Sequence, residues 1–128
     1  MTDNGAYELL REGRRLMELR EDGAAVPLLE LAKLLQPGKG SILEALGQAY
    51  FNNREPGKAS EEFETALELD PTNHWAHYCL SLCLNRLGRL SEAVGHLRLA
   101  VVMEPSNESY RDTLRRFGFR LALSDGQV

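Results

Sequence analysis

The chain has 128 residues, 43% of them hydrophobic and 27% charged, which is the size and composition of one soluble globular domain. Its net charge of −4 argues against general binding to nucleic acids, and no apolar run approaches the length of a membrane span. The first five residues lack the basic and apolar regions of a signal peptide. Cys79 and Cys83 lie on one expected helix with Cβ atoms about 5–6 Å apart, too far for a disulfide. We therefore expect a reduced protein of the cytoplasm.

Three prolines, Pro37, Pro71 and Pro105, recur at intervals of 34 residues. Two alanines and one large apolar residue stand at fixed distances before each proline. The residues in phase are Ala25, Ala59, Ala93, Ala32, Ala66, Ala100, Leu29, Phe63 and Leu97. A period of this length indicates a solenoid of stacked supersecondary units.

The period divides the chain into units at residues 6–39, 40–73 and 74–107, and each unit is expected to form two helices joined by a turn. In the first unit, Pro27 falls inside the second helix. Proline there removes a hydrogen bond and crowds the preceding turn. We therefore expect that helix to start late or to be kinked.

Glycine and proline mark the turns and the helix ends in the other two units. The expected helices are 41–53, 58–69, 75–87 and 91–104. Pro71 and Pro105 close their helices, because the residue before a proline leaves the α region. A last helix over about residues 108–121 carries many charges, as expected of a cap that faces water. Residues 124–128 are expected to be a flexible tail.

The order of large, small and aromatic residues in the second unit resembles the tetratricopeptide-repeat pattern. The matching residues are Leu43, Leu46, Gly47, Tyr50, Ala59, Phe63, Ala66 and Pro71. The third unit departs from it, with Ser81 in the place of the glycine, Leu84 in that of the tyrosine and His77 in that of a large apolar residue. The resemblance covers about residues 6–121. It implies an all-α, right-handed superhelical solenoid of three helix-turn-helix repeats with a capping helix, in a single domain over residues 1–123 that holds another protein.

Successive helical residues turn by about 100°, so the first helix of each unit has one face toward the stack and an opposite face away from it. In the resembled family the opposite face lines a concave groove that binds peptides. The candidate groove residues are Tyr7, Leu10, Arg11, Arg14, Phe51, Trp75, Tyr78, Leu82, Arg86, Arg116 and Phe119. Exposed apolar strips mark contact sites, where aromatic and Arg side chains supply much of the energy. Two other interpretations stay open: packing between neighbouring first helices, and closure of the groove by self-association or by the chain's own tail.

The arginines make the candidate groove basic, whereas the second helix of the second unit is acidic. Its carboxylates are Glu61, Glu62, Glu64 and Glu68. A partner segment with large apolar residues and some Asp or Glu would complement such a groove.

Some members of the resembled family hold a C-terminal carboxylate with Lys and Asn on the groove side of their first helices. The matching places here are Leu10, Arg14, Ala45, Trp75 and Cys79. Only Arg14 has a side chain that could serve. We therefore expect this chain not to bind such tails in that way.

Helical geometry argues against a metal site. His74 and His77 lie on a face turned away from Cys79 and Cys83, so the four cannot surround one tetrahedral ion. The sequence has no nucleophile with a base, no glycine-rich phosphate loop and no paired carboxylates in an expected cleft. We expect neither an enzyme nor a cofactor.

The sequence thus predicts a protein-interaction module, an adaptor or co-chaperone-like protein. It would bind an apolar or amphipathic segment of a partner protein in the groove lined by aromatic and Arg side chains. The alternative is a structural subunit that self-associates, or assembles into a larger complex, through the same groove. RNA binding through the groove is argued against by the net acidity.

Overall fold

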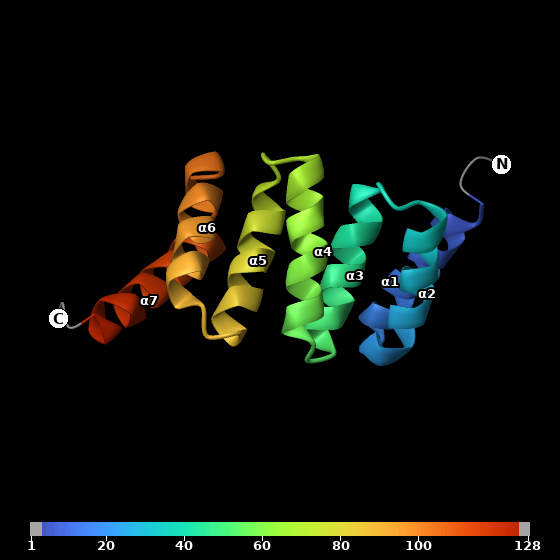
Figure 1. The fold of residues 1–128 in the computed structure, drawn as a ribbon, viewed down its shortest axis with the longest axis horizontal. Helices are drawn as coiled ribbons and strands as arrows, with labels where there is room; N and C mark the ends of the chain where they lie inside the picture. The colour runs from blue at the N-terminus through green and yellow to red at the C-terminus, as the bar shows by residue number, and fades with distance from the viewer. Residues whose placement is uncertain (1–3, 126–128) are drawn as a thin grey trace.

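The computed structural model describes residues 4–125, which form seven α-helices and no strands (Figure 1). In chain order they are α1 (Ala6–Glu18), α2 (Asp22–Leu35), α3 (Gly40–Asn52), α4 (Pro56–Leu69), α5 (His74–Arg86), α6 (Leu90–Met103) and α7 (Glu108–Ser124). The predicted all-α solenoid is confirmed. None of the helices in this described part has the length and hydropathy needed to cross a membrane.

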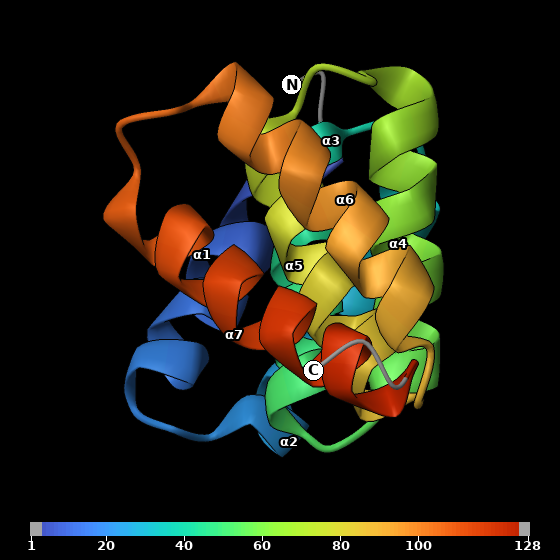
Figure 2. The same ribbon diagram turned by 90° about the vertical axis from the view of Figure 1, so that its left-hand side faces the viewer.

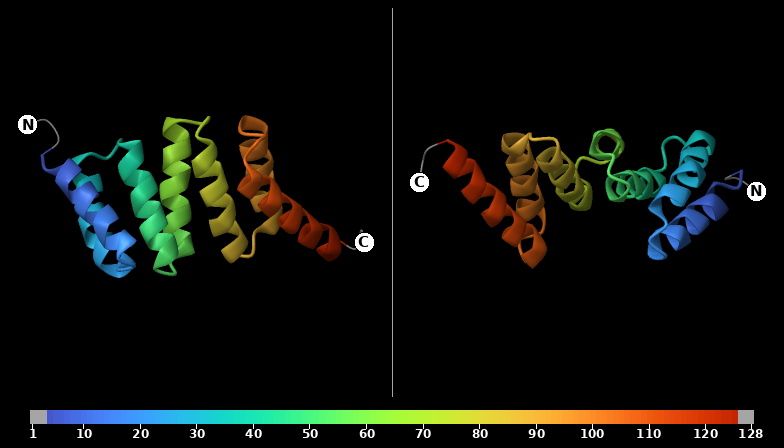
Figure 3. Two further views of the ribbon diagram at one scale, coloured as in Figure 1. Left: turned by 180° about the vertical axis from the view of Figure 1, so that it is seen from behind. Right: turned by 90° about the horizontal axis from the view of Figure 1, so that it is seen from below.

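The helices form two layers, seen end-on in Figure 2. The outer layer of α2, α4 and α6 lies in front in Figure 1, and the inner layer of α1, α3, α5 and α7 lies in front in Figure 3, left. Each helix contacts the next in sequence, and α3 also contacts both α1 and α5. Seen from below (Figure 3, right), the stack is an arch, and α1 and α7 project from its two ends on the same side. The inner layer therefore lies on the concave side of the arch.

Small residues let the two helices of each unit approach closely. The six in-phase alanines have at most 2% of their surface exposed. A Cβ atom added to Gly13 would lie 2.7 Å from the side chain of Leu29, and one added to Gly47 would lie 2.8 Å from the ring of Phe63. Because Leu29 and Phe63 are themselves buried, glycine is the residue that fits where these helices cross.

The three units turn between their helices in the same way. The turn residues Arg20, Arg54 and Gly88 have left-handed backbones, with φ of 64°, 64° and 79°. In each turn the residue that follows donates its N–H to a carbonyl near the end of the first helix, at a distance of 2.8 Å. This is the hydrogen bond of a Schellman motif. Glycine adopts this backbone without steric cost, whereas arginine does so at about 1–2 kcal/mol.

Pro27 does not delay the start of its helix. The helix α2 begins at Asp22 and contains Pro27, so the predicted late start is wrong. Pro27 has no N–H to donate to the carbonyl of Gly23, four residues earlier. Both residues are exposed. Water can hydrogen-bond to the Gly23 carbonyl, and the helix is preserved.

The last helix, α7, extends to Ser124, beyond its predicted end at residue 121. Ser124 therefore belongs to the helix and not to the predicted tail, and its hydroxyl donates to the Leu121 carbonyl at 2.9 Å. Residues 126–128 of that tail lie outside the described residues.

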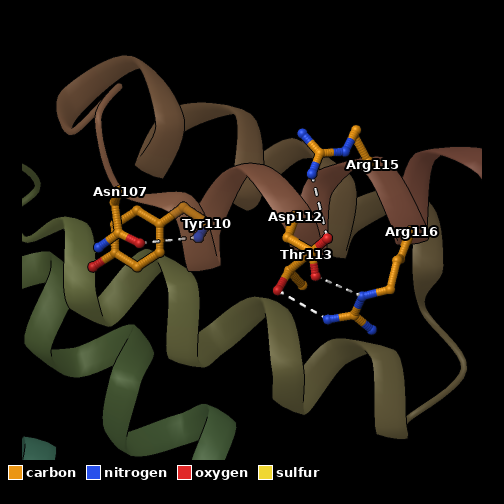
Figure 4. A network of polar contacts seen from close by, with 6 residues as sticks. All are labelled: Asn107, Tyr110, Asp112, Thr113, Arg115 and Arg116. Carbon is orange, nitrogen blue, oxygen red and sulfur yellow. Dashed lines mark hydrogen bonds and ion pairs between the residues drawn. The ribbon is translucent and has the colours of Figure 1, made fainter.

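A network of polar contacts lies along the first half of α7 (Figure 4). The Asn107 side chain accepts the Tyr110 N–H at 3.0 Å and caps the start of the helix. The Asp112 carboxylate lies 3.3 Å from Arg115 and 3.2 Å from Arg116. Arg115 is exposed and stands at the place that glycine has in the first two units, which agrees with a helix that faces water there.

Two polar contacts join α2 to α3 and α4. Glu62, predicted to lie on the acidic outer face, is only 6% exposed and pairs with Lys33 at 3.0 Å. That prediction is wrong for Glu62, which is buried beside Lys33 of α2. The Tyr50 hydroxyl of α3 donates to the Glu30 carboxylate of α2. Burial, and then the hydrogen bond to Glu30, raises the pKa of Tyr50.

Two stacked imidazoles lie between α5 and α6. The His77 Nε2 lies 3.0 Å from the Pro71 carbonyl, and its Nδ1 lies 3.0 Å from the Nδ1 of His96. Because a carbonyl can only accept, His77 Nε2 carries a proton, and one of the two facing Nδ1 atoms must lack one. Burial, and then the neighbouring His77, lowers the pKa of His96, while Glu92 acts weakly in the other direction.

We therefore expect the chain to lose stability as the pH falls below about 6.5, the usual pKa of histidine. As the pH decreases, His96 is protonated in the unfolded chain before it is protonated in the folded one. The contribution of neutral His96 to the free energy of unfolding is therefore fully present above about pH 6.5, and it is lost as the pH falls toward the lowered pKa of the folded chain. Urea unfolding between about pH 8 and about pH 5.5 measures the effect. The variant His96→Gln should unfold with a flatter pH dependence, and an equal dependence in both proteins would contradict the assignment.

Candidate functional site

The inner layer contains a hollow of about 300 Å³ between α3 and α5. We call it the apolar hollow, and its lining residues are Gln48, Phe51, Asn52, Phe63, Trp75, Tyr78, Cys79 and Leu82. Most of these side chains are apolar or aromatic, and the buried Phe63 reaches the hollow from α4. Small apolar hollows of this kind accept an apolar side chain of a ligand.

Four of the predicted groove residues, Phe51, Trp75, Tyr78 and Leu82, line the apolar hollow together. Trp75 is 38% exposed, and the other three are half-buried. The rings of Trp75 and Tyr78 lie 5.7 Å apart. These side chains therefore pack on one another and also reach solvent.

Tyr110 of α7 packs against Tyr78 of this cluster, and the sequence analysis did not predict it as a site residue. It is 2% exposed, its ring lies 4.8 Å from that of Tyr78, and its hydroxyl lies 2.8 Å from Nδ1 of His74. The 34-residue period could have predicted its burial, because Tyr110 is in phase with Ile42 and Ala76, which are buried in the stack.

The structure corrects the prediction for Leu10. Leu10 is 4% exposed and belongs to the core, because α1 contacts α3 as well as α2. Tyr7, Arg11 and Arg14 of the same helix are exposed, and the Arg11 guanidinium lies 5.8 Å from the Tyr7 ring. Of these, Arg14 lines a hollow that shares Gln48 with the apolar hollow.

The predicted groove residues of α7 lie outside the apolar hollow. Phe119 is 57% exposed. Arg116 is held by its own helix, since it pairs with Asp112 at 3.2 Å and donates to the Thr113 hydroxyl at 3.2 Å. Figure 4 shows both contacts. Arg116 is therefore a partly neutralised charge and not a free one.

A second hollow, of about 880 Å³, lies where the first helices of the units end. We call it the arginine hollow, and its lining residues are Met17, Arg20, Asp22, Phe51, Asn52, Arg54, Pro56 and Arg86. Only Arg86 among its arginines was predicted as a site residue, and its guanidinium lies 4.8 Å from the Phe51 ring. The two hollows adjoin each other, because Phe51 and Asn52 line both of them.

The cysteines and histidines have structural surroundings. Cys79 and Cys83 are free thiols, both buried, and burial raises the pKa of each. They fill apolar space as small side chains do. Within residues 4–125, no group of three or more His, Cys, Asp or Glu side chains is arranged to hold a metal ion.

Comparison with known protein families explains this architecture. A family profile described as tetratricopeptide repeat matches residues 41–73, and a second profile of that description matches residues 62–95. The chain is a tetratricopeptide-repeat protein. The matched region of this tetratricopeptide-repeat protein covers α3, α4 and α5 and so includes both sides of the apolar hollow.

The relatives of this tetratricopeptide-repeat protein are distant in sequence and close in fold. Superkiller complex protein 3 of Mus musculus is 28% identical over 109 residues, and the match spans 85% of this chain but 7% of that protein. The first TPR of Spaghetti (RPAP3), bound to the HSP90 peptide SRMEEVD, has a TM-score of 0.89 at 19% identity, covering 94% of this chain and 95% of that one. The Sgt2 TPR domain from Aspergillus fumigatus has a TM-score of 0.88 at 20% identity, covering 95% and 82%.

Proposed function

We propose that this tetratricopeptide-repeat protein is a non-enzymatic adaptor that binds an apolar or amphipathic segment of a partner protein along its inner layer. The observation that carries the proposal is the apolar hollow, where Phe51, Trp75 and Leu82 surround open space without being fully covered. The similar RPAP3 domain is bound to a peptide of HSP90, which supports a peptide as the kind of ligand. The two buried free thiols fit a reducing compartment, so the cytoplasm is the proposed location.

The partner segment is expected to differ from a tail held by its C-terminal carboxylate. Of the five places where the family's carboxylate-binding residues would stand, Leu10, Ala45 and Cys79 are buried and apolar. Trp75 is exposed but has no positive charge, so Arg14 is the single cation among the five places. The proposed ligand is therefore an internal segment whose apolar side chain enters the apolar hollow.

The variant Trp75→Ala tests this function. Peptides selected from a randomised library for binding to the full chain are expected to bind the variant about thirtyfold more weakly, because an aromatic anchor at an interface contributes about 2 kcal/mol or more. The urea midpoint should change little, since Trp75 reaches solvent. Fluorescence anisotropy and urea unfolding measure the two quantities.

Leu34→Ala is the matched control, because Leu34 is 77% exposed on α2, in the layer opposite the apolar hollow. It should bind the peptides as the unchanged chain does. Undiminished binding by Trp75→Ala would contradict the proposal. Unfolding of Trp75→Ala would assign the residue to the core and contradict it as well.

A second candidate function is assembly of the chain with itself. A different surface, formed by exposed apolar side chains of α2 and α6, could serve this function. Leu31 and Leu34 of α2 are 46% and 77% exposed, and Leu99 and Val102 of α6 are 45% and 77% exposed. These side chains lie in the outer layer and not in the apolar hollow. Sedimentation at several protein concentrations separates the candidates, because an adaptor sediments as a monomer throughout.

A further inference from the structure

The arginine hollow brings together side chains from three different units. Arg20 follows α1, Arg54 follows α3, and Arg86 is the last residue of α5. The 34-residue period places the first two at the same point of successive units. All three line one space of about 880 Å³.

These three charges have no carboxylate partner. Within residues 4–125, no ion pair includes Arg20, Arg54 or Arg86. By contrast, Arg15, Arg89 and Arg115 each pair with a carboxylate three residues away. The one carboxylate that lines the hollow, Asp22, accepts a hydrogen bond from Asn52 at 3.1 Å. A chain of net charge −4 thus concentrates positive charge at this place.

The turns themselves do not need arginine. Arg20 and Arg54 are held at φ of 64°, a backbone that glycine adopts more easily and that Gly88 adopts in the third unit. The same hydrogen bond closes all three turns. The arginine side chains are therefore not explained by the turn geometry, and both residues line the hollow.

Apolar side chains orient the charges and connect the hollow to the rest of the inner layer. The Arg86 guanidinium lies over the Phe51 ring at 4.8 Å, and Met17 and Pro56 provide further apolar surface. Phe51 also lines the apolar hollow. One extended or helical segment can therefore place an apolar side chain in the apolar hollow and an adjacent carboxylate in the arginine hollow.

We propose that the arginine hollow recognises an acidic stretch, Asp or Glu, next to the apolar anchor of the partner segment. Guanidinium groups bind carboxylates through paired, charge-assisted hydrogen bonds. The inference rests on the proposed function and names the chemistry of its partner. The site is separate from the five places that match the family's carboxylate-binding positions, because none of them lines the arginine hollow. Those places are Leu10, Arg14, Ala45, Trp75 and Cys79.

The test compares two pools of short peptides that share a randomised apolar centre, flanked in one pool by glutamate and in the other by glutamine. The proteins are the full chain and the double variant Arg20→Asn/Arg54→Asn, since asparagine tolerates the left-handed backbone. The variant Arg20→Gly/Arg54→Gly serves as a second form in case the first folds poorly. Arg98→Gln/Lys39→Gln is the charge-matched control, because both residues are exposed and have no ion pair in the described chain.

The glutamate pool is expected to bind the full chain at least about tenfold more tightly than the glutamine pool, and more weakly as salt rises. The double variants should lose this preference, and the charge-matched control should keep it. Equal binding of the two pools, or a preference that survives in the double variants, would overturn the inference. If the glutamine pool still binds in a manner that depends on Trp75, the proposed function stands and only the acidic preference fails.

Two further outcomes are informative. If neither pool binds the full chain, both the acidic preference and the proposed function are contradicted. If single-stranded RNA displaces the glutamate pool at lower concentration than unlabelled glutamate peptides do, the hollow is a nucleic-acid site and the inference is wrong.

Discussion

Replacing Phe63 with alanine is expected to lower the free energy of unfolding by about 3–5 kcal/mol. Phe63 is 1% exposed, and its ring fills the space where α4 crosses α3 at Gly47. No neighbouring backbone can move in to close the cavity without separating helices that the buried alanines hold together. Urea unfolding followed by circular dichroism measures the loss.

Phe119→Ala is the control for this loss, because Phe119 is 57% exposed on α7. Removing the same number of atoms there should change the stability by less than about 0.5 kcal/mol. A similar loss in both variants would mean that Phe63 is not the side chain that the crossing of α3 and α4 requires.

The second large effect is expected for Gly47→Val, at about 2–3 kcal/mol of destabilisation. A Cβ atom at this position would lie 2.8 Å from two atoms of the Phe63 ring, which is itself enclosed. Valine adds two methyl groups beyond that atom, so α3 and α4 must separate or Phe63 must leave its position. Thermal and urea unfolding measure the change.

Gly95→Ala provides a control of opposite sign. Gly95 lies inside α6, is exposed, and has no atom within 4 Å of an added Cβ, so alanine should stabilise the helix by up to about 1 kcal/mol. Adding Phe63→Leu to Gly47→Val should recover part of the loss, because the smaller side chain vacates the contact. If Gly47→Val is as stable as the unchanged chain, the close approach of the two helices is not as described.

The sequence was sufficient for the solenoid because its contacts repeat in register. Alanine at the crossings and a large apolar residue between them depend only on the spacing within one unit, so one period predicts every unit. The start of the helix that contains Pro27 was predicted wrongly. The repeat period does not show whether the carbonyl that loses its hydrogen bond is exposed to water.

The candidate site was less predictable because it depends on neighbours that a single helix does not reveal. Leu10 has the position of a groove residue on its own helix, but the contact of α1 with α3 buries it. Glu62 of α4 is buried as well, beside Lys33 of α2. Arg20 and Arg54 lie in turns, to which helical periodicity assigns no face, so their convergence with Arg86 is visible only in three dimensions.

The alanine and glycine crossings have a consequence for engineering. They hold the frame through backbone proximity and buried contacts, so the exposed side chains that border the two hollows carry little of the architecture. These exposed side chains include Trp75, Arg20, Arg54 and Arg86. A library randomised at Trp75, Arg20, Arg54 and Arg86 would therefore retain a folded majority and yield binders of new specificity from a single scaffold.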